Sequence, residues 1–276
     1  MPVAHDHDYP ALADEIAGWL RHHLEQAGAS RLVVGLSGGI DSAVVCALCT
    51  MAVGPSRVIA AILPIASRPV DRDDAESVAR EFEVIPREID LSPVYDALVA
   101  AMPDDDAAGL EDANVAAASQ EMRRRLTLAN LKPRLRMTTL YYLANRYNGL
   151  VVGTGNKTEL SIGYFTKYGD GGVDLLPLGD LDKTTVRALA QALGVPQPVI
   201  AKAPSAGLWE GQTDEAEIGY TYEALDEALR RLAAENAGEV DPALTNRVSS
   251  LIASSEHKRR PVPIFLRDEV DRRESR

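Results

Sequence analysis

Residues 33–45 read VVGLSGGIDSAVV and combine two structural signals in one short stretch. The apolar residues 32–36 favour β structure and predict a buried parallel strand. The paired glycines permit backbone angles that other residues resist, so a tight turn is expected next. Asp41 is favourable at a helix start, and the apolar run 43–51 predicts the helix itself. The stretch therefore predicts a unit of strand, glycine turn and helix.

A glycine turn of this kind predicts a site for phosphate. Several backbone N–H groups point at one spot beside the positive end of the following helix, and that arrangement attracts an anion. A carboxylate at this place needs a cation, so Asp41 suggests Mg²⁺ held between the acid and bound phosphates. The alternative is an ordinary strand-to-helix turn, in which Asp41 and Ser42 only favour the helix start.

The motif Ser-Gly-Gly-x-Asp-Ser over residues 37–42 is more specific than a bare glycine turn. It lacks the Gly-Lys-Ser/Thr ending of the Walker pattern, and it is not the Gly-x-Gly-x-x-Gly dinucleotide fingerprint. It resembles the P-loop-like pyrophosphate loop of the N-type ATP pyrophosphatases, which cleave ATP between its α and β phosphates. That group includes NAD, GMP and asparagine synthetases and tRNA-modifying enzymes, and the loop alone does not choose among them.

The composition is that of a globular protein with an acidic balance. The chain has 276 residues, 46% of them hydrophobic, and a net charge of −12, so nucleic acid is not an expected partner. No apolar run is long enough for a membrane span and the first residues lack a signal pattern. We therefore expect a cytoplasmic protein without a membrane partner, folded as one large α/β domain or two small ones.

Apolar segments and helical patterns alternate along the first half of the chain. This alternation predicts an α/β fold, a doubly wound parallel sheet flanked by helices. Pro133 is expected to interrupt the longest helical segment. The expected strands are 32–36, 57–65, 84–91 and 149–153, and the expected helices are 11–27, 43–51, 71–82, one that opens at Ser92, and 113–147.

Glycine and proline punctuate the second half, where segments 161–182 and 195–216 show little periodicity. Loops that long inside a compact domain are usually lids or binding loops, or are disordered. Tyr164, Phe165 and Tyr168 suggest stacking on a nucleotide base, and the alternative is rings tucked into the core. Helices are expected over 183–194, 221–236 and 242–258.

Polar residues follow the last expected strand, where residues 153–159 read GTGNKTE. Ligands of open α/β sheets bind beyond the carboxyl ends of the strands. Thr154 is therefore expected to reach a nucleotide, and Glu159 to supply a second carboxylate for Mg²⁺. A turn with a capping Thr-Glu pair explains the same residues equally well. Lys183 opposes the dipole of the helix that it begins, which favours a functional role.

Two other groups of residues have a plain structural interpretation. Cys46 and Cys49 have C-x-x-C spacing, but without a second pair or nearby histidines we expect buried thiols rather than a zinc or redox centre. His5 and His7 are expected in a mobile terminus rather than in a metal site. The basic run 257–260 predicts either a solvated helix end or a site for phosphate or carboxylate.

Several blocks between residues 30 and 263 together resemble bacterial NAD synthetase: GLSGGIDS, NLKPRLRM, GTGNKTE, GYFTKYGDGGVDLLPLGDLDK, PSAGLWEGQTDE and HKRRPVP. The fourth and fifth blocks are specific to that family. The resemblance implies an adenine-nucleotide α-hydrolase-like, Rossmann-like fold. It also implies ATP-dependent amidation of deamido-NAD through an adenylate, the last step of NAD biosynthesis, with AMP and pyrophosphate as the other products. Because residues 1–276 lack the glutaminase domain of the glutamine-using members, we expect a single NAD synthetase domain that uses ammonia and forms a homodimer.

The resemblance implies roles for individual residues. The residues implied to bind ATP are Gly35, Leu36, Ser37, Gly38, Gly39, Ile40, Asp41, Ser42, Thr154, Lys183 and Ser205. Those implied to bind Mg²⁺ are Asp41 and Glu159, and the catalytic residues are Asp41 and Lys183. Those implied to contact deamido-NAD are Arg134, Lys167, Asp174, His257 and Lys258.

One stretch departs from the family pattern. Many members have Arg-Leu-Pro and then a glutamine near ATP, whereas this chain has Ile62, Leu63, Pro64 and then Arg68. Arg68 is expected to replace the missing arginine in part.

Two other functions are alternatives to NAD synthesis: an N-type ATP pyrophosphatase for another nucleotide or RNA, and a nucleotide-binding protein without activity. A tRNA thiolase is expected to show catalytic cysteines and a basic face, and a mere binder has no use for two acids and Lys183 around phosphate.

Overall fold

Four parallel strands form the centre of the computed structural model, which describes residues 8–102, 117–205, 207, 209, 212–234 and 241–265. The strands are β1 (Arg31–Gly35), β2 (Val58–Ile62), β3 (Arg87–Glu88) and β4 (Gly149–Val152), in the order β3-β2-β1-β4. Val33 of β1 lies opposite Ile59 on one side and Val151 on the other. The expectation for His5 and His7 concerns residues outside those described.

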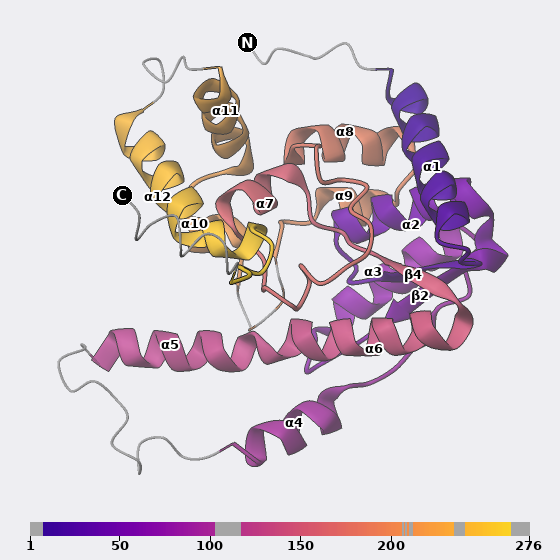
Figure 1. The fold of residues 1–276 in the computed structure, drawn as a ribbon, viewed down its shortest axis with the longest axis horizontal. Helices are drawn as coiled ribbons and strands as arrows, with labels where there is room; N and C mark the ends of the chain where they lie inside the picture. The colour runs from indigo at the N-terminus through magenta and orange to yellow at the C-terminus, as the bar shows by residue number, and fades with distance from the viewer. Residues whose placement is uncertain are drawn as a thin grey trace.

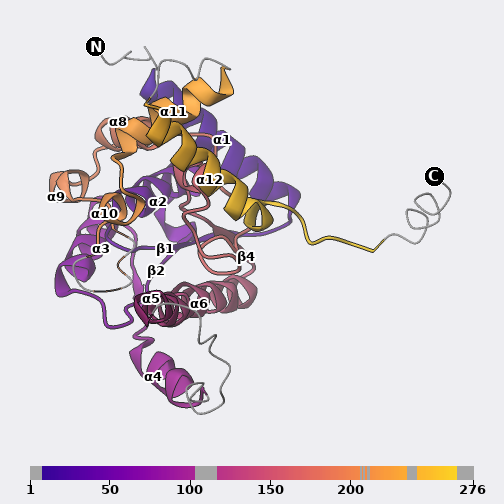
Figure 2. The ribbon, with the colours of Figure 1, turned by 90° about the vertical axis from the view of Figure 1, so that its left-hand side faces the viewer.

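Helices cover both faces of this sheet, so the doubly wound α/β prediction is confirmed. The helices on one face are α1 (Tyr9–Gln26), α2 (Ile40–Val53), α3 (Pro69–Glu81) and α8 (Lys183–Ala192). Those on the other are α4 (Ser92–Ala100) and α6 (Leu131–Tyr147), and α5 (Ala117–Ala129) continues α6 outward as one long rod (Figure 1). Turned by 90°, the strands lie between α2 and α6 (Figure 2).

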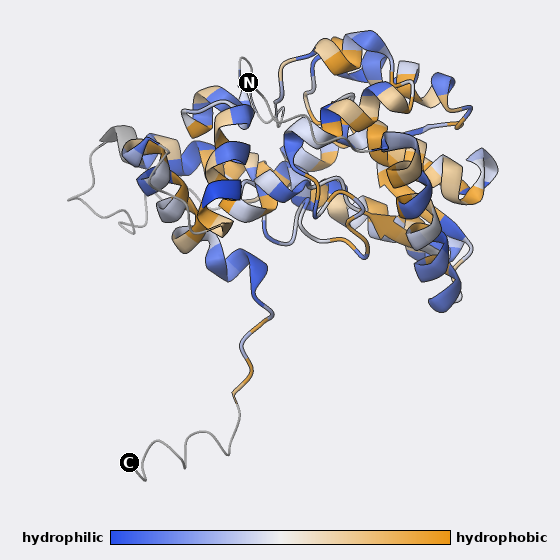
Figure 3. Cartoon of the chain, turned by 90° about the horizontal axis from the view of Figure 1, so that it is seen from above, coloured by the Kyte–Doolittle hydropathy of each residue, from blue (hydrophilic) through white to orange (hydrophobic). Residues whose placement is uncertain are grey.

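The apolar runs of the sequence produce this layering. Alternate residues of β1 enter opposite cores, since Val34 packs on the α2 side and Val33 on the α6 side. All residues of β2 are buried, as a strand covered on both faces requires, and the strands are correspondingly hydrophobic in Figure 3. Cys46 and Cys49 are buried and unpaired, and burial raises the pKa of Cys46 to about 12, so the expectation of buried thiols is confirmed.

A smaller helical layer stands beside the sheet. Its helices are α7 (Lys157–Ile162), α10 (Asp214–Ile218), α11 (Tyr222–Ala233) and α12 (Pro242–Arg259). The short helix α9 (Gln197–Ala201) packs instead on the α2 face of the sheet through Val199. Ile162, Tyr222 and Val248 belong to a core of their own, separate from the two sheet cores. No helix of the described residues is long and apolar enough to cross a membrane.

Three expectations about element bounds were wrong. The third strand is far shorter than 84–91, because Val84 bonds back to Ala79 of α3, and beyond β3 only the single bonds of Ile89 to Ile62 and of Leu91 to Pro64 follow. The long helical region breaks at Asn130, whereas Pro133 lies in the first turn of α6, where its missing N–H is not needed. The segments 161–182 and 195–216 are not wholly irregular, since they contain the end of α7 together with α9 and α10.

Candidate active site

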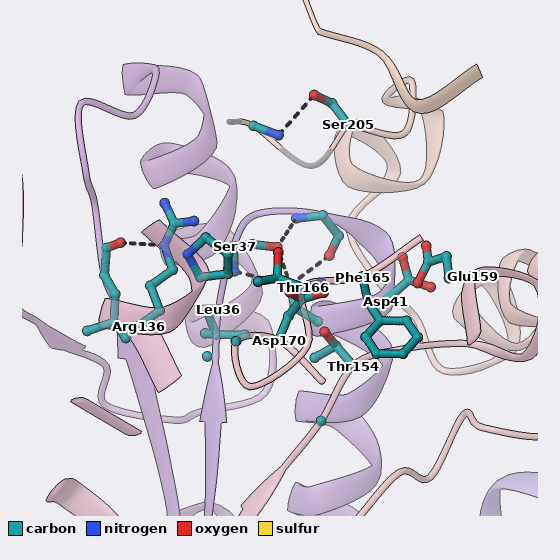
Figure 4. Close-up of a pocket in the computed structure, with 18 of the residues that line it drawn as sticks. Leu36, Ser37, Asp41, Arg136, Thr154, Glu159, Phe165, Thr166, Asp170 and Ser205 are labelled. Atoms are coloured by element: carbon teal, nitrogen blue, oxygen red, sulfur yellow. Dashed lines mark hydrogen bonds between the residues drawn. The ribbon is translucent and has the colours of Figure 1, made fainter. Parts of the chain in front are cut away.

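A cavity of about 560 Å³ opens beyond the carboxyl ends of β1, β2 and β4. Leu36, Leu63 and Gly153, which follow these three strands directly, all line it. Figure 4 shows the side chains around it. This is the edge where an open parallel sheet binds its ligands, as the sequence predicted.

The glycine turn is held in shape by its own serines. The Ser37 N–H donates to Ser42 Oγ at 3.2 Å, and Ser42 Oγ donates to the Gly39 carbonyl at 2.9 Å. Gly38 has φ +76°, and a Cβ there would lie 2.2 Å from the carbonyl oxygen of Asp71 in α3. Only glycine fits at this position, because the turn is left-handed and packed directly against a backbone.

Lys183 joins the two carboxylates that the sequence assigned to Mg²⁺. Its Nζ lies 2.6 Å from Asp41 Oδ2 and 3.1 Å from Glu159 Oε1, and the side chain is only 2% exposed. Asn156 Nδ2 donates to the other Asp41 oxygen at 2.9 Å, and the Tyr222 ring lies 4.7 Å from Nζ. Residues from α2, α7 and α8 therefore meet at one point beside the glycine turn.

The electrostatics of this group favour a bound cation. Burial raises the pKa of Glu159, the charge of Asp41 adds to the rise, and Lys183 opposes it. Burial alone lowers the pKa of Lys183, but the two carboxylates outweigh it and raise that pKa above its ordinary value. Two carboxylates against one ammonium leave surplus negative charge, and carboxylate oxygens are ligands that Mg²⁺ prefers. The two carboxylates therefore fit a divalent cation that takes its other ligands from phosphate oxygens.

Glu159 also serves the local structure. The Asn156 side chain accepts from the Glu159 N–H at 3.0 Å, and Glu159 Oε2 accepts from the Asn156 N–H at 3.4 Å, which completes a capping box at the start of α7. The capping interpretation was thus right in kind, but the partner is Asn156 and not a threonine. Thr154 lines the cavity, as expected for a nucleotide contact.

A second charged group lies on the opposite side of the glycine turn, and no sequence pattern predicted it. Lys202 Nζ lies 2.7 Å from Asp71, 2.6 Å from Asp74 and 3.3 Å from the Gly38 carbonyl. Arg68, the expected substitute for the family arginine, lines the cavity but pairs with Asp71 at 2.8 Å. Its contact with ATP stays a prediction.

The loop residues expected near ATP divide into those that face the cavity and those that do not. Ser205 lines it, and its Oγ donates to the Gln212 carbonyl at 2.7 Å. The same Oγ accepts from the Gly207 N–H at 3.1 Å, which closes a local turn (Figure 4). Tyr164 and Phe165 also line it. Tyr168 is 56% exposed and does not, so base stacking is open only to the first two rings.

The residues expected to contact deamido-NAD form a connected set that reaches the cavity at one end. Lys258 lines the cavity and donates to the Phe165 carbonyl at 2.7 Å. Lys167 Nζ donates to the carbonyl of His257 at 2.6 Å, and Arg134 Nη2 donates to that of Lys167 at 3.4 Å. Lys167, His257 and Arg134 do not line the cavity itself.

Asp174 lies apart from that set, beside β4. It accepts from the Tyr141 hydroxyl at 2.9 Å and from the Val151 N–H at 2.7 Å. These contacts tie the loop after α7 to the sheet and to α6. Asp174 does not line the cavity, so its contact with the dinucleotide stays a prediction.

Comparison with known proteins identifies the family of this site. A family model described as NAD synthase matches residues 12–262. The chain belongs to the NAD synthase family. The NH(3)-dependent NAD(+) synthetase of Carboxydothermus hydrogenoformans is 47% identical over 90% of this chain and 93% of its own length. That of Methanosarcina acetivorans is 42% identical over 93% of this chain and 98% of its own length.

Solved structures agree with this NAD synthase fold. NMN synthetase from Francisella tularensis superposes with a TM-score of 0.80 at 33% identity, over 94% of this chain and 99% of that one. NH3-dependent NAD synthetase from Campylobacter jejuni gives a TM-score of 0.74 at 26% identity, over 94% of this chain and 100% of that one. The resemblance and the Rossmann-like fold expected from the sequence motifs are therefore confirmed.

Proposed function

We propose that this NAD synthase family member is an ammonia-dependent NAD synthetase, which converts deamido-NAD, ATP and ammonia into NAD, AMP and pyrophosphate. The observation that carries the proposal is the meeting of the glycine turn with Lys183, Asp41 and Glu159 in one cavity. Relatives that are named for the use of NH(3) match this chain over nearly their whole length. The fold is proposed to act as a single NAD synthetase domain.

The first step is attack of the nicotinate carboxylate on the α-phosphorus of ATP. A new bond forms between a carboxylate oxygen and the α-phosphorus. The bond from that phosphorus to the oxygen that bridges to the β-phosphate breaks, and pyrophosphate leaves. A carboxylate is already nucleophilic, so this chain need not supply a strong base. The glycine turn around Ser37–Gly39 is proposed to hold phosphate oxygens, and the ammonium of Lys183 is proposed to neutralise the charge that develops on the leaving pyrophosphate.

Asp41 and Glu159 are proposed to hold Mg²⁺ beside these phosphates. When bound, the ion supplies further charge neutralisation at the pyrophosphate. Each Asp41 oxygen already accepts one hydrogen bond, from Asn156 or from Lys183, so the carboxylate is oriented before any ligand arrives. An ionised carboxylate has lone pairs to spare for a metal.

In the second step ammonia attacks the activated carbonyl, the bond to AMP breaks, and the amide of NAD remains. Water would hydrolyse the adenylate, so this step needs a site from which water is excluded. Leu36, Phe165 and Pro204 line the cavity with apolar surface, and Tyr164 adds an aromatic wall. These residues are proposed to shield the adenylate.

Several finer assignments belong to the same proposal. Arg134, Lys167, Asp174, His257 and Lys258 are proposed to receive the dinucleotide. The protein is proposed to work in the cytoplasm as a homodimer, with the α5–α6 rod as the contact region. The exposed side chains on that rod that support this are Met122 and Tyr142.

The decisive experiment incubates the purified protein with Mg-ATP, an ammonium salt and either deamido-NAD or nicotinate mononucleotide, and follows NAD, NMN and AMP by chromatography. Parallel reactions replace ammonium with glutamine. NAD and AMP formed in equal amounts with ammonium alone support the proposal. The mononucleotide is included because NMN synthetase is among the structures similar to this chain. Preference for the mononucleotide would make the protein an NMN synthetase instead.

A further inference from the structure

Arg136 is a cavity residue that the mechanism above does not use. It belongs to α6, on the face of the sheet opposite α2 and α8, and it lines the cavity. Its Nε donates to the Leu63 carbonyl at 3.0 Å, and its Nη2 reaches Ser67 Oγ at 3.5 Å. Both partners are neutral acceptors, so they orient the guanidinium without neutralising its charge.

Several other cations of the cavity are held differently. Three of them are paired with carboxylates: Arg68 with Asp71 at 2.8 Å, Lys183 with Asp41 at 2.6 Å, and Lys202 with Asp74 at 2.6 Å. Arg136 forms no ion pair with any residue that the structure describes. Burial lowers the pKa of Arg136, and the more distant charges of Asp170 and Asp71 oppose the effect. A buried charge without a counterion is costly, so this position is stabilised when an anion arrives with the ligand.

The place of Arg136 indicates which anion that is. It lies beside Leu63 at the carboxyl end of β2, next to the phosphate-binding turn after β1. In Figure 4 it stands on one side of Ser37, and Asp41 and Glu159 stand on the other. The planar fork of a guanidinium matches two oxygens of a phosphate. Ile62, the last residue of β2, supplies no charge of its own.

We infer that Arg136 binds a phosphate group of a nucleotide substrate from the α6 side of the cavity, opposite Lys183. Both ATP and deamido-NAD carry such groups, and the contact is chemically the same in either case. The inference rests on the proposed function only for the identity of these two nucleotides. ATP binding can be measured without turnover, so a failure of the amidation assay would leave this test intact.

The test compares substitutions at two arginines of the same helix. Arg136→Met removes the charge and keeps a long apolar stem. Arg146→Met is the matched control, because Arg146 is exposed and, among the described residues, its hydrogen-bond partners are the hydroxyls of Tyr142 and Tyr147. Affinities for Mg-ATP and for deamido-NAD are measured separately by calorimetry, together with the melting temperature of each variant. We expect Arg136→Met to weaken the binding of one nucleotide about 10- to 100-fold, the loss typical of a charged hydrogen-bond partner, and Arg146→Met to change neither.

The nucleotide that loses affinity identifies the source of the phosphate. Arg136→Lys should recover part of the loss, since it keeps the charge but not the fork. Arg136→Gln separates binding from positioning, because its amide can still donate to the Leu63 carbonyl but carries no charge. Affinities of wild-type strength in Arg136→Gln, or unchanged affinities for both nucleotides in folded Arg136→Met, would overturn the inference.

Discussion

Two charged clusters flank the glycine turn, and they differ in charge balance. The α3 cluster comprises Arg68, Asp71, Asp74 and Lys202, and the Lys183 cluster comprises Asp41, Glu159 and Lys183. In the α3 cluster two cations face two carboxylates, so the charges cancel. In the Lys183 cluster one cation faces two carboxylates. The α3 cluster is therefore balanced by its own charges, whereas the Lys183 cluster keeps surplus negative charge, which fits the proposed metal ion.

Burial sharpens the difference between the two lysines. The Lys183 side chain is 2% exposed, and that of Lys202 is 19% exposed. Water screens the charges around Lys202 but hardly reaches Lys183. Lys202 also donates to the Gly38 carbonyl, so the α3 cluster holds the backbone of the turn in place. One cluster therefore shapes the turn, and the other is the one proposed to meet bound phosphates.

Neutralising one carboxylate in each cluster should have the largest and most unequal effect on catalysis. Asp41→Asn removes a proposed metal ligand and should lower kcat about 100- to 1,000-fold, the loss typical when one group that stabilises transition-state charge is removed. Asp74→Asn is the matched control, and its effect should be small because Lys202 keeps its ion pair with Asp71. Steady-state rates at saturating ATP and deamido-NAD measure both. Equal losses in the two variants would contradict the assignment of different roles to the clusters.

Replacing each lysine tests the same comparison through stability. Lys183→Met leaves two largely buried carboxylates without their cation and should lower the free energy of unfolding by about 3 kcal/mol. Lys202→Met should lower the free energy of unfolding by about 1 kcal/mol or less, since Asp71 keeps its ion pair with Arg68 and water screens the charge of Asp74. Urea unfolding followed by circular dichroism gives both values. A larger loss in Lys202→Met would mean that the α3 cluster, and not the Lys183 cluster, anchors the site.

The sequence predicted what depends on neighbours in the chain. The strand, the glycine turn and the helix over residues 33–45 were predicted correctly because β propensity, turn chemistry and helix capping all act within a few residues. The meeting of Asp41 with Glu159 also followed, since parallel strands place their carboxyl ends at one edge. Lys183 was singled out by a local conflict with the helix dipole.

Contacts set only by the tertiary fold were missed. Lys202 follows a short helix in a segment without periodicity, so nothing local showed that it would reach α3. Arg136 was one of two arginines in the same block, and only the packing of α6 on the sheet shows that it turns into the cavity. Asn156 was visible in the motif, but its bond to Asp41 depends on α7 meeting α2. The break at Asn130 was likewise misplaced to Pro133, because a proline in a first helical turn reads locally as an interruption.

The smallest expected effect is the response of each cluster to Mg²⁺ alone. A ligand that binds only the folded state stabilises it, by about 2.7 kcal/mol at a concentration of 100 Kd. Without nucleotide the Lys183 cluster offers only two carboxylate ligands, so binding should be weak and the melting temperature should rise by about 2 °C in millimolar Mg²⁺. Glu159→Gln should lose this rise and Asp74→Asn should keep it. A rise that disappears in Asp74→Asn instead would place the cation in the α3 cluster, and charge balance would then not distinguish the two sites.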